Sequence, residues 1–252
     1  MKYAIVESRK REAAKGLKGF CPICGLPVRP KCGKYKINHW AHISNENCDK
    51  WWENETEWHR NWKDKFPRDW QEIIAYDEEN DEKHIADIKT NLGLVIEIQH
   101  SVISDEERSS REKFYKNMIW IVDGTRRKSD YKHFIEANHY NSTFWRISPD
   151  SPIYIIELTH FFLPKEWLNS SVPVIFDFRG LFDNDYENYN QLREPLWCLL
   201  PNTIQNKRIV IEYPRDSFVQ QIKTDGLIFN IRDISDKVYQ AINKKNIERR
   251  TY

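Results

Sequence analysis

The sequence predicts an α/β fold whose core runs helix, strand, strand, helix, strand, preceded by a small N-terminal unit and followed by a mixed α/β extension. Two observations support this fold class. Between residues 53 and 123 the spacing of apolar residues switches twice from helical to strand periodicity. The 252-residue chain is also 40% hydrophobic and 31% charged, so it has enough apolar side chain for a packed core and does not resemble a disordered protein.

The first element of this core is a helix predicted over residues 53–66. Trp58, Trp62 and Phe66 recur at positions i, i+4 and i+8 and so form one apolar stripe, and Pro67 ends the pattern.

Two strands, a second helix and a third strand follow in order. Residues 84–90 and 94–102 are predicted strands of a hairpin around an Asn-Leu-Gly turn. Ser104 and Glu107 form a capping box, which predicts a helix that begins there and runs to about residue 117. The apolar run 118–122, which ends at Asp-Gly, indicates a buried strand.

The flanking regions divide the chain into three predicted parts. Residues 1–50 are expected to form a small unit of short strands and turns, residues 51–140 the core, and residues 141–252 an extension of unknown role. The extension contains short apolar runs at 153–158, 172–178, 196–200 and 209–213 and a predicted helix at 238–250, but no motif that indicates chemistry.

Hydropathy and cysteine content exclude several classes of protein. The mean hydropathy is -0.76, and the chain lacks an apolar stretch of about 18 residues, which excludes a membrane span. The first residues lack the apolar region of a signal peptide, so a cytoplasmic location is expected. Five cysteines in such a chain favour metal binding or burial over disulfides.

Charge is distributed unevenly along the chain, although the formal net charge is only +1. Residues 1–40 contain ten Lys or Arg and two acidic residues, a balance of +8, whereas residues 53–90 have a balance of -6. A basic segment next to an acidic one suits a protein that binds an anion and holds cations; the alternative is a solvated charged surface.

Cysteine and histidine residues gather between residues 21 and 48 with the spacing of a zinc site. Cys21 and Cys24 form a C-x2-C pair, and the following Gly25 lets the backbone turn toward the thiolates. A tetrahedral Zn²⁺ needs four N or S ligands, enough of which are present here for a structural site. The second pair is predicted to be His42 and Cys48, with His39 as the substitute and Cys32 not excluded. The alternative is a reduced knuckle without metal.

Two acidic residues are predicted to face each other across the hairpin. If the strands pair around the turn, Asp87 lies opposite Glu97, with Cβ atoms about 4.5–5.5 Å apart. Like charges so placed are destabilising unless a divalent cation lies between them, and Mg²⁺ or Mn²⁺ suits such oxygen ligands. An apolar packed face (Ala86, Ile88, Thr90, Leu94, Ile96, Ile98) and an open polar face (Asp87, Lys89, Val95, Glu97, Gln99) are expected. The alternative is a solvent-facing hairpin with two incidental acids.

These residues resemble the motif of the PD-(D/E)xK nuclease superfamily. Asp87 followed by Glu97-Ile98-Gln99 resembles its E-x-Q form, and ETEWH with Lys63 resembles its E-x-x-H/K helix. The series CPICGLPV, HWAH, ETEWH, HIADIKT, VIEIQHS, SDEERSSREKFY and MIWIVDG resembles the competence protein CoiA family over about residues 1–130. The resemblance implies a restriction-endonuclease-like core in residues 51–140 after a zinc-binding unit.

The resemblance also implies roles for individual residues. Asp87 and Glu97 would bind the catalytic Mg²⁺ with the Ile98 carbonyl, and Glu57 would reach the metal shell from the helix. Gln99 would stand near the attacking water; because it carries no charge, the metal must contribute more to catalysis. Nucleic acid is expected to contact two sets of helix residues: His59 and Lys63, and Arg108, Arg111 and Tyr115. For His59 and Lys63 the alternative is ion pairing with Glu55, and for Arg108 and Arg111 it is a solvated helix face.

The leading hypothesis is therefore a Mg²⁺- or Mn²⁺-dependent deoxyribonuclease with a structural Zn²⁺, acting in DNA uptake, recombination or defence against foreign DNA. Its partner would be single- or double-stranded DNA, with a second copy or a recombination or defence protein as further candidates. A nuclease-fold accessory protein with weak or absent cleavage is the alternative. The presence of Glu57, Asp87 and Glu97 favours the enzyme. A zinc-stapled interaction scaffold is the third hypothesis.

Overall fold

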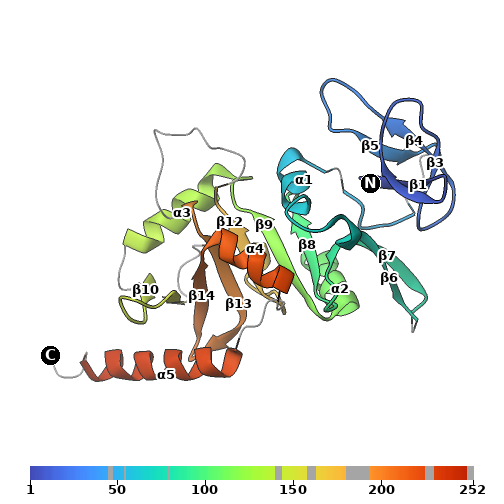
Figure 1. The fold of residues 1–252 in the computed structure, drawn as a ribbon. Helices are drawn as coiled ribbons and strands as arrows, with labels where there is room; N and C mark the ends of the chain where they lie inside the picture. The colour runs from blue at the N-terminus through green and yellow to red at the C-terminus, as the bar shows by residue number, and fades with distance from the viewer. Residues whose placement is uncertain are drawn as a thin grey trace.

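The computed structural model describes residues 1–44, 48–53, 55–78, 80–139, 144–157, 163–179, 193–224 and 230–248. These residues form two sheets (Figure 1): an N-terminal sheet in the order β2-β1-β3-β4-β5 and a nine-stranded sheet in the order β10-β11-β14-β13-β12-β9-β8-β7-β6. The nine-stranded sheet mixes parallel and antiparallel pairs and carries helices, so the predicted mixed α/β class is confirmed.

The N-terminal sheet is built from short antiparallel strands. Its strands are β1 (Tyr3–Val6), β2 (Arg9–Glu12), β3 (Gly19–Phe20), β4 (Pro27–Lys31) and β5 (His39–His42). They enclose a small core around Ala4, Val28 and Trp40. A core of this size contributes little stability by itself, so a unit like this benefits from a metal that links its turns.

The middle of the chain forms one half of the large sheet and its first helices. The elements are α1 (Glu57–Lys63), the 3-10 turn η1 (Arg68–Trp70), β6 (Gln71–Asp77), β7 (Glu82–Lys89), β8 (Val95–Gln99), α2 (Asp105–Tyr115) and β9 (Met118–Asp123). β6, β7 and β8 pair antiparallel, and β8 pairs parallel with β9.

Capping side chains set where these helices begin. Ser104 Oγ accepts a hydrogen bond from the Glu107 N–H at 3.1 Å, which confirms Ser104 as the N-cap of α2, while the Glu107 carboxylate pairs with Arg111. Thr56 Oγ1 accepts from the His59 N–H at 3.2 Å, so α1 begins at Glu57 and not at residue 53 as expected. Glu55 therefore precedes the helix.

The C-terminal half continues the same sheet. Its elements are α3 (Lys128–His139), β10 (Phe144–Arg146), β11 (Ile153–Glu157), the 3-10 turn η2 (Lys165–Trp167), β12 (Val174–Asp177), β13 (Leu196–Ile204), β14 (Lys207–Tyr213), α4 (Arg215–Thr224) and α5 (Ile231–Glu248). Each predicted apolar run coincides with a strand, and the predicted terminal helix lies in α5; residues 158, 249 and 250 lie outside the described part.

The expected boundary at residue 140 does not separate two sheets. β9 is buried along its whole length, and its backbone pairs on one side with β8 and on the other with β12 in parallel register. A buried strand needs partners at both edges because unpaired backbone groups are costly. The C-terminal strands therefore complete the sheet that the core begins.

Helices cover both faces of the large sheet (Figure 1). One core includes Tyr115 of α2 and Phe134 of α3, and the other includes Trp62 of α1, Phe218 of α4 and Val238 of α5. Of the helices in the described ranges, not one is long and apolar enough to cross a lipid bilayer.

Candidate active site and zinc centre

The central hairpin opens into a fork at Asp87. β7 and β8 pair through Ile88 with Ile96 and through Lys89 with Val95, and the ladder stops there. Beyond it, carboxylates take the place of backbone acceptors. The Asp87 N–H donates to Glu97 Oε1 at 3.2 Å, and the Ile98 N–H donates to Asp87 Oδ2 at 2.9 Å. The two acids are thus held across the gap between the strands, as the hairpin pattern predicted.

Helix α1 places a histidine and a lysine over this fork. His59 Nε2 lies 3.0 Å from Asp87 Oδ1, and Lys63 Nζ lies 2.9 Å from the same oxygen. The two side chains are four residues apart and so project from one face of the helix. Both are buried, and Lys63 pairs with Glu55, as the ion-pair alternative expected.

Lys63 is enclosed by carboxylates. Besides Asp87, it pairs with Glu55 and, at 3.2 Å, with Glu72 Oε1. Burial would lower the pKa of Lys63, but Asp87, Glu55 and Glu72 outweigh it and raise the pKa well above its usual value. The lysine is therefore a fixed positive charge in this site.

The two opposed acids have different proton affinities. Burial would raise the pKa of Asp87, but the charges of His59 and Lys63 hold it well below its usual range. Burial and the neighbouring Asp87 raise the pKa of Glu97 to about 8, against the opposing effect of Arg111. A bound cation would change this balance by favouring both carboxylates in the charged form.

A cavity of about 60 Å³ opens onto these groups. Its lining includes Glu55, His59, Lys63, Asp87, Glu97 and Gln99. One ligand atom from each of Glu55, His59 and Asp87 lies within 4.8 Å of the other two, which is compact enough for one metal ion. Gln99 is fixed in place because its Nε2 donates to Glu53 Oε1 at 2.6 Å.

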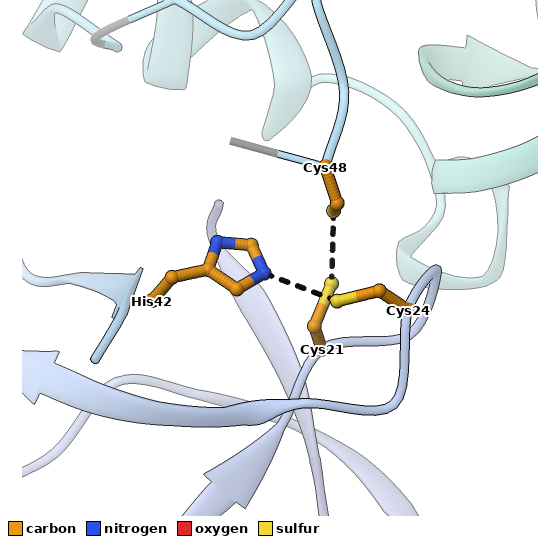
Figure 2. Close-up of side chains that lie close together, drawn as sticks. All are labelled: Cys21, Cys24, His42 and Cys48. Atoms are coloured by element: carbon orange, nitrogen blue, oxygen red, sulfur yellow. Dashed lines mark hydrogen bonds between the residues drawn. The ribbon is translucent and has the colours of Figure 1, made fainter. Parts of the chain in front are cut away.

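A second cluster lies in the N-terminal unit. Figure 2 shows Cys21, Cys24, His42 and Cys48 converging from separate turns and the end of β5. Cys21 Sγ lies 3.5 Å from Cys48 Sγ, and Cys24 Sγ lies 3.3 Å from His42 Nε2. In a tetrahedral zinc site, such ligand atoms are about 3.5–3.8 Å apart. The four residues therefore fit a zinc ion.

The local backbone explains how the knuckle forms. Gly25 has a φ of +70°, and its N–H donates to the Cys21 carbonyl at 3.0 Å. Burial and the neighbouring thiols of Cys21 and Cys24 raise the pKa of Cys48, an effect that zinc would relieve by binding the thiolate. The His39 ring instead contacts the Ile37 carbonyl at 2.9 Å, and Cys32 lies outside the cluster. The structure thus brings His42 and Cys48, the predicted second pair, together with Cys21 and Cys24.

Two family models match this chain in sequence. Residues 6–50 match the N-terminal domain of competence protein CoiA, and residues 56–169 match its nuclease-like domain. The chain belongs to the competence protein CoiA family. No curated protein and no solved structure matches it. The CoiA N-terminal match contains the zinc-type cluster, and the nuclease-like match contains the strand fork with His59 and Lys63.

Within this CoiA nuclease-like domain, the expected role of Glu57 is corrected. Glu57 is solvent exposed and is not among the residues that line the cavity, whereas Glu55 does line it. The physical reason is the Thr56 cap: Glu57 occupies the first helical turn and points outward, while Glu55 precedes the helix and turns back onto Lys63.

The expectation that α2 contacts phosphate is also corrected. Arg108, Arg111 and Tyr115 share a helix face as predicted, but that face packs against the sheet and all three are buried. Arg108 Nη1 lies 2.9 Å from Glu112 Oε1, and Arg111 Nη1 lies 3.1 Å from Glu97 Oε2. These guanidinium groups are occupied by carboxylates, and Arg111 holds Glu97 in position.

The polar face of the hairpin is covered as well. Glu97 and Gln99 are only 4% and 2% exposed, so the expectation of an open face is wrong. Ala86 packs in the same core as Val95 and not with Ile88. Ile88, Leu94, Ile96 and Ile98 do form the predicted apolar face.

Glu72 links the CoiA N-terminal domain to the site, and sequence reasoning missed it. Its carboxylate accepts hydrogen bonds from the N–H groups of Lys2 at 2.6 Å and Tyr3 at 2.9 Å, and it also pairs with Lys63. Glu72 has a φ of +48° within the β6–β7 ladder, between Gln71, which pairs with Ile88, and Ile73, which pairs with Ala86. Strand β1 thus contacts the residue that holds Lys63.

Proposed function

We propose that this chain is a metal-dependent deoxyribonuclease that hydrolyses phosphodiester bonds during competence. The observation that carries the proposal is the strand fork, where Asp87 and Glu97 face one cavity and His59 and Lys63 reach Asp87 at 3.0 and 2.9 Å. Two carboxylates with adjacent cationic groups are what metal-assisted phosphoryl chemistry requires.

The donor set suits a hard divalent cation. Asp87, Glu97 and the Ile98 carbonyl are the proposed ligands, and Glu55 takes the place expected for Glu57. Oxygen ligands with room for water favour Mg²⁺ or Mn²⁺. Such an ion supplies a Lewis acid and lowers the pKa of a bound water.

Lys63, Gln99 and His59, which surround the proposed metal site, have different roles. Lys63 brings a permanent positive charge next to Asp87, which makes up for the neutral Gln99 at the position where related nucleases use lysine. Gln99, held by Glu53, orients the attacking water through its amide. His59 stands 3.0 Å from Asp87 Oδ1 and fixes the direction of that carboxylate.

The N-terminal unit supplies the surface that holds DNA. Its zinc cluster stabilises a small sheet, from which these basic side chains are exposed: Arg9, Lys15, Lys18, Arg29, Lys31, Lys34 and Lys36. Phosphate contacts of this kind provide sequence-independent affinity that decreases with salt. Because β1 contacts Glu72, this surface is fixed relative to the fork.

One observation favours the second candidate, an accessory protein that binds DNA without efficient cleavage. Each carboxylate oxygen of the pair already has a partner: Asp87 accepts from Ile98 and contacts His59 and Lys63, and Glu97 accepts from the Asp87 N–H and from Arg111. A site whose carboxylate oxygens already have partners binds a metal less readily than a site whose carboxylates are unpaired.

A cleavage assay distinguishes the two candidates. The purified chain is incubated with circular and linear duplex DNA, single-stranded DNA and RNA, in Mg²⁺, Mn²⁺ or EDTA, with Asp87→Ala as the control. Cleavage of DNA that needs the metal and is lost in Asp87→Ala supports the enzyme. DNA binding by both proteins without cleavage of any substrate supports the accessory protein.

A further inference from the structure

Trp52 packs at the edge of the N-terminal core and is only partly buried there, unlike the fully packed tryptophans around it. Among the residues that the structure describes, Trp51 stacks on His84, the indole of Trp40 donates to the Arg11 carbonyl, and the indoles of Trp58 and Trp62 donate to Asp177. Within the described ranges the Trp52 ring has packing contacts with this core but is not stacked on another ring. Its backbone N–H donates to the Asp49 carbonyl at 3.2 Å.

This half-buried ring stands between two cavities. The first is the cavity of about 60 Å³ at the strand fork, and the second, of about 180 Å³, lies beside the zinc cluster. Four residues line both: Met1, Asp49, Trp52 and Ile85. The larger cavity also has Trp40, Ala41, His42, Ser44 and Cys48 in its wall. A ligand in it would therefore lie next to the proposed catalytic groups.

The lining suits a flat aromatic ligand with a polar edge. Indole, Ile85 and Met1 offer apolar surface, while the hydroxyl of Ser44 lies at an exposed position of the wall. Nucleobases combine a π-face with a polar edge, and aromatic side chains in nucleic-acid-binding proteins stack on them with little sequence preference.

We propose that the larger cavity binds one unpaired nucleobase of the substrate, stacked on Trp52, beside the phosphate that the fork cleaves. Paired bases remain inside the duplex stack, so occupation of the cavity requires a single strand, a frayed end or a displaced nucleotide. The substrate class is therefore single-stranded DNA or DNA with an unpaired segment. This inference rests on the proposed nuclease function, because that function makes the neighbouring fork the site of the phosphate.

Equilibrium binding without added Mg²⁺ or Mn²⁺ tests the stacking without cleavage and leaves the zinc centre intact. The probes are a fluorescently labelled oligothymidylate and a duplex of the same length, and the readout is fluorescence anisotropy. Trp52→Ala is expected to weaken binding of the single strand about tenfold, and Trp52→Leu as much, because leucine fills space without stacking. Trp52→Phe should retain most of the affinity. Trp145→Ala, on β10 at the far edge of the sheet, is the matched control and should bind as the parent does.

A series of oligonucleotides with one abasic position each gives the sharper test. The parent protein should lose affinity when one particular base is missing, and Trp52→Leu should lose no more at that position. Unchanged affinity in Trp52→Leu, equal affinity of the parent for single strand and duplex, or equal abasic losses in both proteins would overturn the proposal. Because these measurements leave out only the catalytic cation, a failed cleavage assay leaves them interpretable. Cleavage together with unchanged binding by the Trp52 variants would reject the stacking alone.

Discussion

Lys63 Nζ lies 2.9 Å from Asp87 Oδ1, although the two residues come from different elements, helix α1 and strand β7. The lysine is 2% exposed, so the helix carries a fully enclosed positive charge into the strand fork. This relationship provides a cation beside the proposed metal ligand.

Replacing Lys63 tests whether that charge contributes to catalysis. Lys63→Met is expected to lower the rate of DNA cleavage by about 100-fold or more, since it removes a positive group near developing charge. It should also lower the free energy of unfolding by about 3 kcal/mol, because Glu55 and Glu72 lose a buried partner. Cleavage rates and thermal unfolding measure both effects. Lys65→Met, at an exposed position, is the control. Parental cleavage by Lys63→Met would rule out a catalytic charge.

The pair Glu55 and Glu57 tests which acid belongs to the site. Glu55→Gln is expected to reduce metal-dependent cleavage at least tenfold, because Glu55 lines the cavity and pairs with Lys63. Glu57→Gln should leave the rate unchanged, because Glu57 is exposed. Both rates are measured at several Mn²⁺ concentrations. The opposite ranking of the two variants would restore the role first expected for Glu57.

The cysteines provide a matched test of the zinc centre. Cys24→Ser is expected to abolish the binding of one zinc per chain and to lower the unfolding temperature, because the small N-terminal sheet depends on the metal. Cys32→Ser should retain the zinc, since Cys32 lies outside the cluster. Elemental analysis of the freshly purified proteins measures the zinc content, and calorimetry measures the unfolding temperature. Parent protein without zinc, or loss of zinc in Cys32→Ser, would contradict the assignment.

Asp177 predicts a dependence of stability on pH. Burial would raise its pKa, but Arg215 and the indoles of Trp58 and Trp62 outweigh burial and hold the pKa below its usual value. A carboxyl group with a lowered folded-state pKa stabilises the protein above its unfolded value, and this contribution is lost as the pH falls through the folded-state pKa. Stability that depends on Asp177 should therefore disappear below about pH 4.

Asp177→Asn measures that contribution. At pH 7 the variant is expected to be less stable by about 3 kcal/mol, because Arg215 is left without its buried partner. The difference from the parent should shrink as the pH falls toward 3. Urea unfolding at several pH values tests this, with exposed Asp216→Asn as the control. A difference that stays constant with pH would show that the charge of Asp177 is not the cause.

Local signals predicted much of the fold and of the site. The Ser104 cap, the strand ending at Asp123 and the opposition of Asp87 and Glu97 follow from spacing within a few residues, and the structure contains all three. The zinc-type cluster follows from a short motif in the same way.

Contacts between distant parts of the chain determine features that the spacing of residues in the sequence could not predict. The period of α2 places Arg108 and Arg111 on one face but does not say whether that face meets solvent, and here it is buried through ion pairs. Glu72 has no local signal, because its partners Lys2 and Tyr3 lie about 70 residues earlier in the chain. The choice of Glu55 over Glu57 depends on a single cap, at Thr56.

The cleavage rate of the parent protein and of Asp87→Asn, measured side by side in Mn²⁺ on single-stranded DNA, tests the central claim most directly. Asparagine preserves the shape of the side chain but removes the charge that the metal and Lys63 require. The account predicts metal-dependent cleavage by the parent and a loss of at least 100-fold in a folded Asp87→Asn. Equal cleavage by the two proteins would show that the strand fork is not the site of hydrolysis.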